Sequence, residues 1–112
     1  MKNIISLIGG MLVSIGAFAA QSGFVDISDN RIQIINDNSG GRLFVYDVTI
    51  IDSTCDNNTT PVLMFSGNEL AKEMYSMVLA AKSAGKQVNI VTGTCVDLGG
   101  TTYSPIISVY MQ

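Results

Sequence analysis

The hydrophobic residues within 23–51 fall in two runs typical of β-strands, and the second run is apolar on both faces at its start and alternates between hydrophobic and polar residues after Tyr46. An extended stretch at 23–28 leads through Asp29 and Asn30 into a β-branched run at 31–36. A dense turn cluster at 36–41 precedes a second run at 43–51, where Asp47 and Thr49 mark the wetter face. The pattern predicts that two strands form a hairpin here.

The sequence predicts one helix, over about residues 68–84. Ser66 and Glu69 have the spacing of a capping box, and Gly85 suits the left-handed conformation that ends a helix. Lys82 and Lys86 lie near the negative end of its dipole. The apolar stripe at helical spacing is Leu70, Met74, Met77, Val78 and Ala81. Core packing explains its methionines, and a metal or redox role is the alternative.

The remaining segments complete a mainly β pattern. A polar loop at 52–60 leads to a short third strand at 61–65. The helix is followed by a strand at 87–92, a glycine-containing loop at 95–102 and a strand at 103–111. The order β-β-β-α-β-β is that of the OB-fold, a five-stranded Greek-key barrel. We therefore expect residues 20–112 to form one OB-fold domain, mainly β with one helix.

Residues 1–19 have the pattern of a signal peptide. Lys2 precedes an apolar run at 4–18, and Ala17 and Ala19 have the small-residue spacing that signal peptidase requires, so we expect cleavage before Ala20. A membrane anchor is the alternative, but the run of about 15 residues is shorter than the roughly 20 that span a bilayer. We expect an exported protein, periplasmic or secreted, without a membrane span.

Composition narrows the function classes. The 112 residues are 47% hydrophobic and 13% charged, as in one small globular domain. The net charge of -3 and the lack of a basic run argue against nucleic-acid binding. The chain has no His and no Trp, which removes the His-dependent nucleophile systems and imidazole metal ligands. We expect no enzyme activity, no metal and no cofactor.

The best candidates for catalysis are Glu69 and Glu73, which a helix would place one turn apart. Acidic residues at a helix start more commonly interact with the helix dipole and with solvent. The two cysteines, Cys55 and Cys95, are expected to form a disulfide, because an exported protein meets an oxidising compartment. A reactive or metal-binding thiol pair is the alternative, but it lacks CxxC spacing and a His partner.

One run in the sequence carries a resemblance to a known family. The predicted helix with Tyr75 leads into a strand through Gly85-Lys86-Gln87-Val88-Asn89-Ile90. In this run, and over most of residues 20–112, the chain resembles exported OB-fold proteins that are grouped with the B subunits of bacterial AB5 toxins. Among these, it resembles the B subunits of the subtilase cytotoxin type most. This resemblance implies a homopentamer that binds cell-surface glycans, together with an A subunit encoded elsewhere.

The resemblance also implies a sialic-acid site. Its acidic residue, just before the first barrel strand, matches Asp26, and Asn30 stands at the position where the family has Ser. Tyr46 and Tyr103 could stack on a sugar face, and Asp47 could accept hydrogen bonds from sugar hydroxyls. Packing roles for the tyrosines and a solvated Asp47 are the ordinary alternatives.

These observations lead to two hypotheses of function. The first is a non-catalytic binding module that recognises a glycan. The second is a periplasmic protein-interaction or inhibitor domain without a glycan site. The oligomeric state discriminates between them in part, because the family resemblance implies a pentamer.

Overall fold

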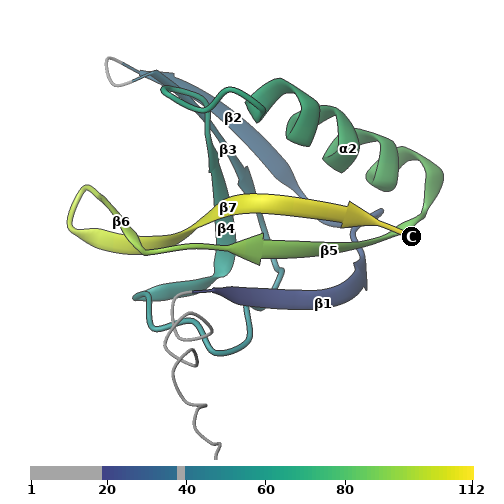
Figure 1. The fold of residues 1–112 in the computed structure, drawn as a ribbon, viewed down its shortest axis with the longest axis horizontal. Helices are drawn as coiled ribbons and strands as arrows, with labels where there is room; N and C mark the ends of the chain where they lie inside the picture. Colours follow the sequence, from purple (N-terminus) through teal and green to yellow (C-terminus); the bar gives the residue numbers. More distant parts are fainter. Residues whose placement is uncertain (1–18, 38–39) are drawn as a thin grey trace, which may run out of the picture.

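The computed structural model describes residues 19–37 and 40–112, so most of the predicted signal peptide lies outside the described residues. The described part is mainly β with one helix, and the chain's disulfide is present (Figure 1). The elements are β1 (Ala20–Asp26), β2 (Ile32–Asp37), β3 (Gly40–Val45), β4 (Asn57–Met64), α2 (Ala71–Ala84), β5 (Gln87–Thr92), β6 (Val96–Leu98) and β7 (Thr101–Met111).

The described strands form one sheet in the order β1-β5-β7-β4-β3-β2, with β6 also paired to β7. Every pairing is antiparallel except that of β4 with β7, which is parallel. In Figure 1 the group β2, β3 and β4 runs across the group β1, β5 and β7, with α2 alongside both. β1 and β2 are consecutive in the chain, but they lie at opposite ends of the strand order.

The sheet has seven strands in the described residues, so the predicted count of five is wrong. Two differences account for the change. Residues 27–31 interrupt the first predicted strand and divide it into β1 and β2. Residues 96–98, inside the predicted loop at 95–102, pair with the start of β7 through Val96↔Tyr103 and Leu98↔Thr101.

The second predicted strand, at 43–51, ends as regular β-structure at Val45. Asp47 has a φ of 61°, in the left-handed region, and this turns the chain out of the ladder. The segment beyond it still runs along β4, because the backbone N–H groups of Val48 and Ile50 donate to the carbonyls of Thr59 and Asn58. The prediction was therefore right about burial in this segment and wrong about its regularity.

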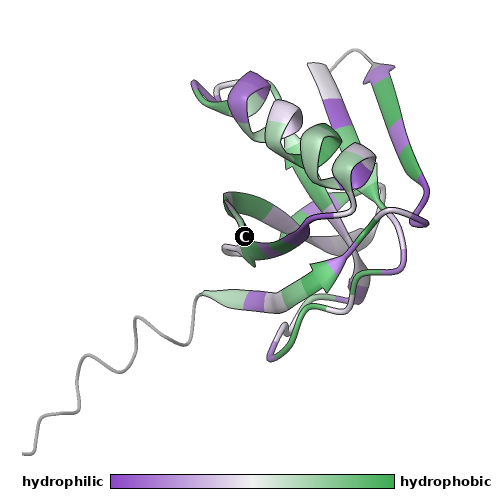
Figure 2. Cartoon of the chain, turned by 90° about the vertical axis from the view of Figure 1, so that its right-hand side faces the viewer, coloured by the Kyte–Doolittle hydropathy of each residue, from purple (hydrophilic) through white to green (hydrophobic). Residues whose placement is uncertain are grey.

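The core lies between the sheet and the helix. Alternate strand residues face inward, and Leu43, Val45, Leu63, Val88 and Ile90 are fully buried. Met74, Val78 and Ala81 of α2 join the same cluster, and Met77 packs against it. The methionines therefore pack in the core. In Figure 2 hydrophobic and hydrophilic bands alternate along β2, whereas β3 is continuously hydrophobic over its second half.

Helix α2 begins three residues later than predicted, at Ala71, and the predicted capping box is wrong. Leu70 occupies the N-cap position without a side-chain cap. The Asn68 side chain instead donates from Nδ2 to the Met64 carbonyl, 2.9 Å away, which stabilises the turn between β4 and α2. At the other end Gly85 adopts the left-handed conformation, with φ 65°, and donates its N–H to Ala81, as the sequence predicts.

The predicted disulfide between Cys55 and Cys95 is confirmed, with Cα atoms 5.6 Å apart. It connects the loop before β4 to the short segment before β6. The Ser104 hydroxyl, on the buried side of β7, donates to the Cys55 sulfur at 3.4 Å. The bridge therefore fixes the end of the sheet where β4, β6 and β7 meet.

Candidate functional site

Three of the residues expected to bind a glycan lie together. Asn30 follows β1, and its Nδ2 donates to the carbonyls of Tyr46 at 2.8 Å and Asp47 at 3.1 Å. These bonds hold the turn after β3 against the connection between β1 and β2. The amide N–H groups of Asn30 are therefore engaged with the backbone, and its role here is to position Tyr46 and Asp47.

Arg31 is a further member of this cluster that the sequence analysis missed. Its guanidinium carbon lies 4.3 Å from the centre of the Tyr46 ring, a cation–π contact. The hairpin register brings the two together, because Ile32 pairs with Val45 and the Tyr46 N–H donates to the Arg31 carbonyl at 2.9 Å. Both residues lie in the predicted strands at 31–36 and 43–51, so the register of that hairpin would have found this contact.

A row of aromatic rings runs from Tyr46 through Phe44 to Tyr103, and we call it the aromatic row. The ring centres are 6.4 Å apart between Tyr46 and Phe44, and 5.5 Å apart between Phe44 and Tyr103. The Tyr46 hydroxyl donates to the side-chain oxygen of Gln33 on β2. Tyr103 is thus joined to the cluster through Phe44, while both tyrosines keep part of their surface exposed.

Asp47 and Asp26 differ in their surroundings. Asp47 is exposed, and its carboxylate accepts no hydrogen bond from the described residues. Asp26, at the end of β1, accepts one from the backbone N–H of Ser28 at 2.9 Å. That bond, helped by the Ser28 hydroxyl, lowers the pKa of the Asp26 carboxyl below its ordinary value. No hydrogen bond in the described part of the chain joins Asp26 to the cluster, so its carboxylate serves a local turn.

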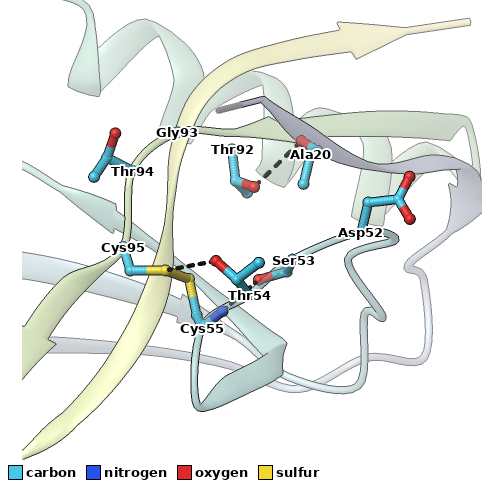
Figure 3. Close-up of a pocket in the computed structure, with 9 residues that line it drawn as sticks. All are labelled: Ala20, Asp52, Ser53, Thr54, Cys55, Thr92, Gly93, Thr94 and Cys95. Carbon is cyan, nitrogen blue, oxygen red and sulfur yellow. Dashed lines mark hydrogen bonds between the residues drawn. A yellow bond between two sulfur atoms is a disulfide. The ribbon is translucent and has the colours of Figure 1, made fainter. Parts of the chain in front are cut away.

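A separate pocket of about 360 Å³ lies beside the disulfide, between the start of β1, the loop at 52–55 and the end of β5 (Figure 3). The Cys55–Cys95 bridge lies at one side of it and Asp52 at the other. Hydroxyl groups dominate its polar lining, which consists of Asp52, Ser53, Thr54, Thr92 and Thr94. The pocket contains none of the residues expected from the sequence to bind a glycan.

An apolar groove lies beside the start of α2. Glu69 and Glu73 are exposed and line this apolar groove of about 480 Å³ together with Ile34, Phe65 and Tyr75.

Within residues 19–37 and 40–112, no group of three or more His, Cys, Asp or Glu side chains could hold a metal ion. The helix in these same ranges is not long and apolar enough to cross a membrane.

Comparison of the chain with protein-family models, with curated proteins and with solved structures finds no match. The function is therefore inferred from the residues and their geometry. The two regions that carry it are the cluster of Asn30, Arg31, Tyr46 and Asp47 and the hydroxyl-lined pocket at Asp52.

Proposed function

We propose that the chain is an exported, non-catalytic binding module that recognises an acidic glycan of the sialic-acid type. The observation that carries this proposal is the stacking of Arg31 on Tyr46 beside the exposed Asp47. A cation, an aromatic ring and a carboxylate acceptor in one exposed cluster have the chemistry that a negatively charged, hydroxyl-rich sugar requires.

Each group would have a distinct role. A guanidinium held over a ring by a cation–π contact keeps N–H donors that can pair with a ligand carboxylate. The Asp47 carboxylate would accept hydrogen bonds from sugar hydroxyls, and exposed edges of the aromatic row would contact the apolar face of the sugar ring. Asn30 would contribute indirectly, because its amide positions the backbone of Tyr46 and Asp47.

An OB-fold barrel is part of the proposal. Two observations support it: residues 27–31 directly join β1 and β2, the two ends of the strand order, and β4 lies parallel to β7. If β1 and β2 are counted as one bent strand, and the short β6 is set aside, five strands remain with the helix between the third and fourth. The resemblance to toxin B subunits adds a homopentamer and an A subunit to the proposal.

A protein-interaction role is the second candidate, and exposed apolar side chains favour it. Ile34, Leu70 and Ile107 each leave more than half of their surface exposed in the single chain. Large apolar side chains exposed in this way are candidates for contact with a partner protein. Self-association would cover such residues without excluding a glycan site, so the oligomeric state must be measured together with glycan binding.

A glycan array on the oxidised protein, run beside light scattering on the same sample, tests the proposal. We expect binding to sialylated glycans that Arg31→Gln and Asp47→Asn each weaken about tenfold, since each removes a charged hydrogen-bond partner. Lys86→Gln is the matched control, because it removes a positive charge from an exposed side chain elsewhere. Binding that survives Arg31→Gln unchanged, or an array without any binding, contradicts the proposed function.

A further inference from the structure

A second binding region lies outside the Arg31 cluster. The pocket beside the disulfide adjoins another of about 410 Å³, and the two share Ala20 and Asp52. The second pocket adds Gln21, Phe24 and Asn89 to the lining. We call the two pockets together the Asp52 groove. Its size falls in the range of about 300–1,000 Å³ that is typical of small-ligand sites.

Asn89 is the unusual residue in this groove. Its side chain is only 8% exposed although it stands on the outward side of β5, between the buried Val88 and Ile90. Its Nδ2 donates to the Gln21 side-chain oxygen at 2.7 Å, but its Oδ1 is buried and accepts no hydrogen bond from the described residues. A buried amide oxygen without a donor destabilises a fold, and such an atom calls for a partner.

The strand register places aromatic side chains on both sides of Asn89. Phe24 of β1 and Tyr110 of β7 are its direct cross-strand neighbours, so all three side chains emerge on the same face of the sheet. Phe24 is 48% exposed and Tyr110 is 55% exposed. The amide therefore lies between two half-exposed rings, an arrangement in which a polar group and an apolar contact surface are next to each other.

Asp52 supplies a charged acceptor to the same groove. It follows Ile51, whose N–H donates to the Gln21 carbonyl at 2.9 Å and so fastens this loop to β1. Asp52 has a φ of 65°, which a residue other than glycine rarely adopts, and its side chain is exposed. Figure 3 shows it across the pocket from the disulfide, next to the start of β1.

We infer that the Asp52 groove binds a neutral, hydroxyl-rich ligand, a sugar unit without a negative charge. One hydroxyl would donate to Asn89 Oδ1 once the exposed Gln21 side chain moves aside, and another would donate to the Asp52 carboxylate. The apolar face of the sugar would lie against Phe24. The side-chain amides of Asn89 and Gln21 offer both hydrogen-bond donors and acceptors. Sugar hydroxyls also donate and accept, so they match these amides better than a cation, which only donates. The negative charge of Asp52 disfavours a ligand carboxylate.

The test is a nuclear magnetic resonance titration of the ¹⁵N-labelled, oxidised protein, read at the side-chain amide signals of Asn89 and Gln21. The probes are methyl α-mannoside, methyl β-galactoside, N-acetylglucosamine, N-acetylneuraminic acid and arginine. We expect saturable shifts with at least one neutral sugar and none at these signals with N-acetylneuraminic acid. Saturation by arginine alone, or no saturable shift with any of the three neutral sugars, overturns the inference.

Two variants locate the binding in the groove. Asn89→Leu removes the amide at nearly constant volume, and Asp52→Asn removes the charge while keeping a residue that tolerates positive φ. Each is expected to weaken binding of the neutral sugar about tenfold. Asp29→Asn, an exposed site on the β1–β2 connection, is the matched control and should leave the affinity unchanged. Unchanged affinity in both groove variants refutes the assignment.

This inference stands apart from the Arg31 cluster, and the experiments separate the two. Arg31→Gln should weaken sialylated-glycan binding about tenfold without altering the titration at Asn89. Loss of the neutral-sugar shifts in Arg31→Gln would show that the two regions form one site and would overturn a separate groove.

Discussion

Lys82 and Asn30 are 52 positions apart in the sequence, yet the Lys82 ammonium donates a hydrogen bond to the Asn30 carbonyl. It also donates to the Ser28 carbonyl at 3.0 Å, and the lysine side chain is half-buried. The last turn of α2 is thereby attached to the connection between β1 and β2. The same connection presents Asn30 and Arg31, so the helix supports the geometry of the candidate glycan site.

Replacing this lysine should destabilise the protein. Lys82→Met keeps the apolar stem but leaves two backbone carbonyls without their charged donor, and we expect a loss of about 2 kcal/mol in the free energy of unfolding. Urea denaturation followed by circular dichroism measures it. Lys86→Met, at an exposed lysine, is the control and should change stability by less than about 0.5 kcal/mol. Equal midpoints for the two variants would contradict the role assigned to Lys82.

The disulfide should contribute strongly to stability, since a small domain has a limited core. Cys55 and Cys95 are 40 residues apart, and closing a loop of that length stabilises the fold by about 3–4 kcal/mol in the chain-entropy model. The double variant Cys55→Ser with Cys95→Ser should show this loss in urea, and reduction of the native protein should reproduce it. An unfolding midpoint unaffected by reduction would show that the bridge adds nothing.

Acid should weaken the turn at Asp26. A carboxyl group whose pKa is lowered in the folded protein stabilises the fold above its unfolded pKa, and this contribution disappears as the pH falls through the folded value. Asp26→Asn cannot titrate, so the stability difference between native protein and variant should shrink as the pH falls below about 4. Unfolding free energies measured in urea between pH 2 and 7 provide the test. A difference that stays constant over that range would rule out this linkage.

Gly85 ends α2, and glycine is needed there because of its backbone conformation and not because of limited space. A Cβ added at Gly85 would meet no atom within 4 Å, yet the φ of 65° is strained for an L side chain. We expect Gly85→Ala to lower the free energy of unfolding by about 1 kcal/mol, and Gly85→Asn to cost less because Asn tolerates this region. Thermal unfolding of the two variants compares them. The reverse order would point to a packing effect in place of backbone strain.

Local sequence signals correctly predicted those features of the fold that neighbouring residues determine. The strand at 87–92 and the left-handed Gly85 follow from β-branched alternation and from helix-stop chemistry, and both agree with the structure. The start of α2 was wrong because the Ser66 and Glu69 spacing is only a local match. The chain there forms a turn held by Asn68 and Met64 instead.

Other parts of the fold depend on contacts between segments that are far apart in the sequence, so the local sequence pattern could not predict them. Asn57 and Asn58 belong to a polar stretch that was interpreted as loop, yet they begin β4 because Tyr103 of β7 lies beside Asn57 in the sheet. The Asp52 groove has the same origin. Gln21, Asp52 and Asn89 come from three separate segments, and nothing in their spacing relates them. The Arg31 contact with Tyr46, in contrast, was accessible from the hairpin register.

The parallel pairing of β4 with β7 has a consequence for how the chain folds. Asn57 lies beside Tyr103 in the ladder, and α2 and β5 intervene in the sequence, so forming this pair closes a long loop. The Cys55–Cys95 bridge lies just before β4 and shortly before β7. Once it has formed, the two strands are separated by a short covalent path, and their pairing becomes nearly local. Oxidation thus brings together two strands that are far apart in the sequence, so that their pairing nucleates easily, and the oxidised chain should refold faster than the reduced one.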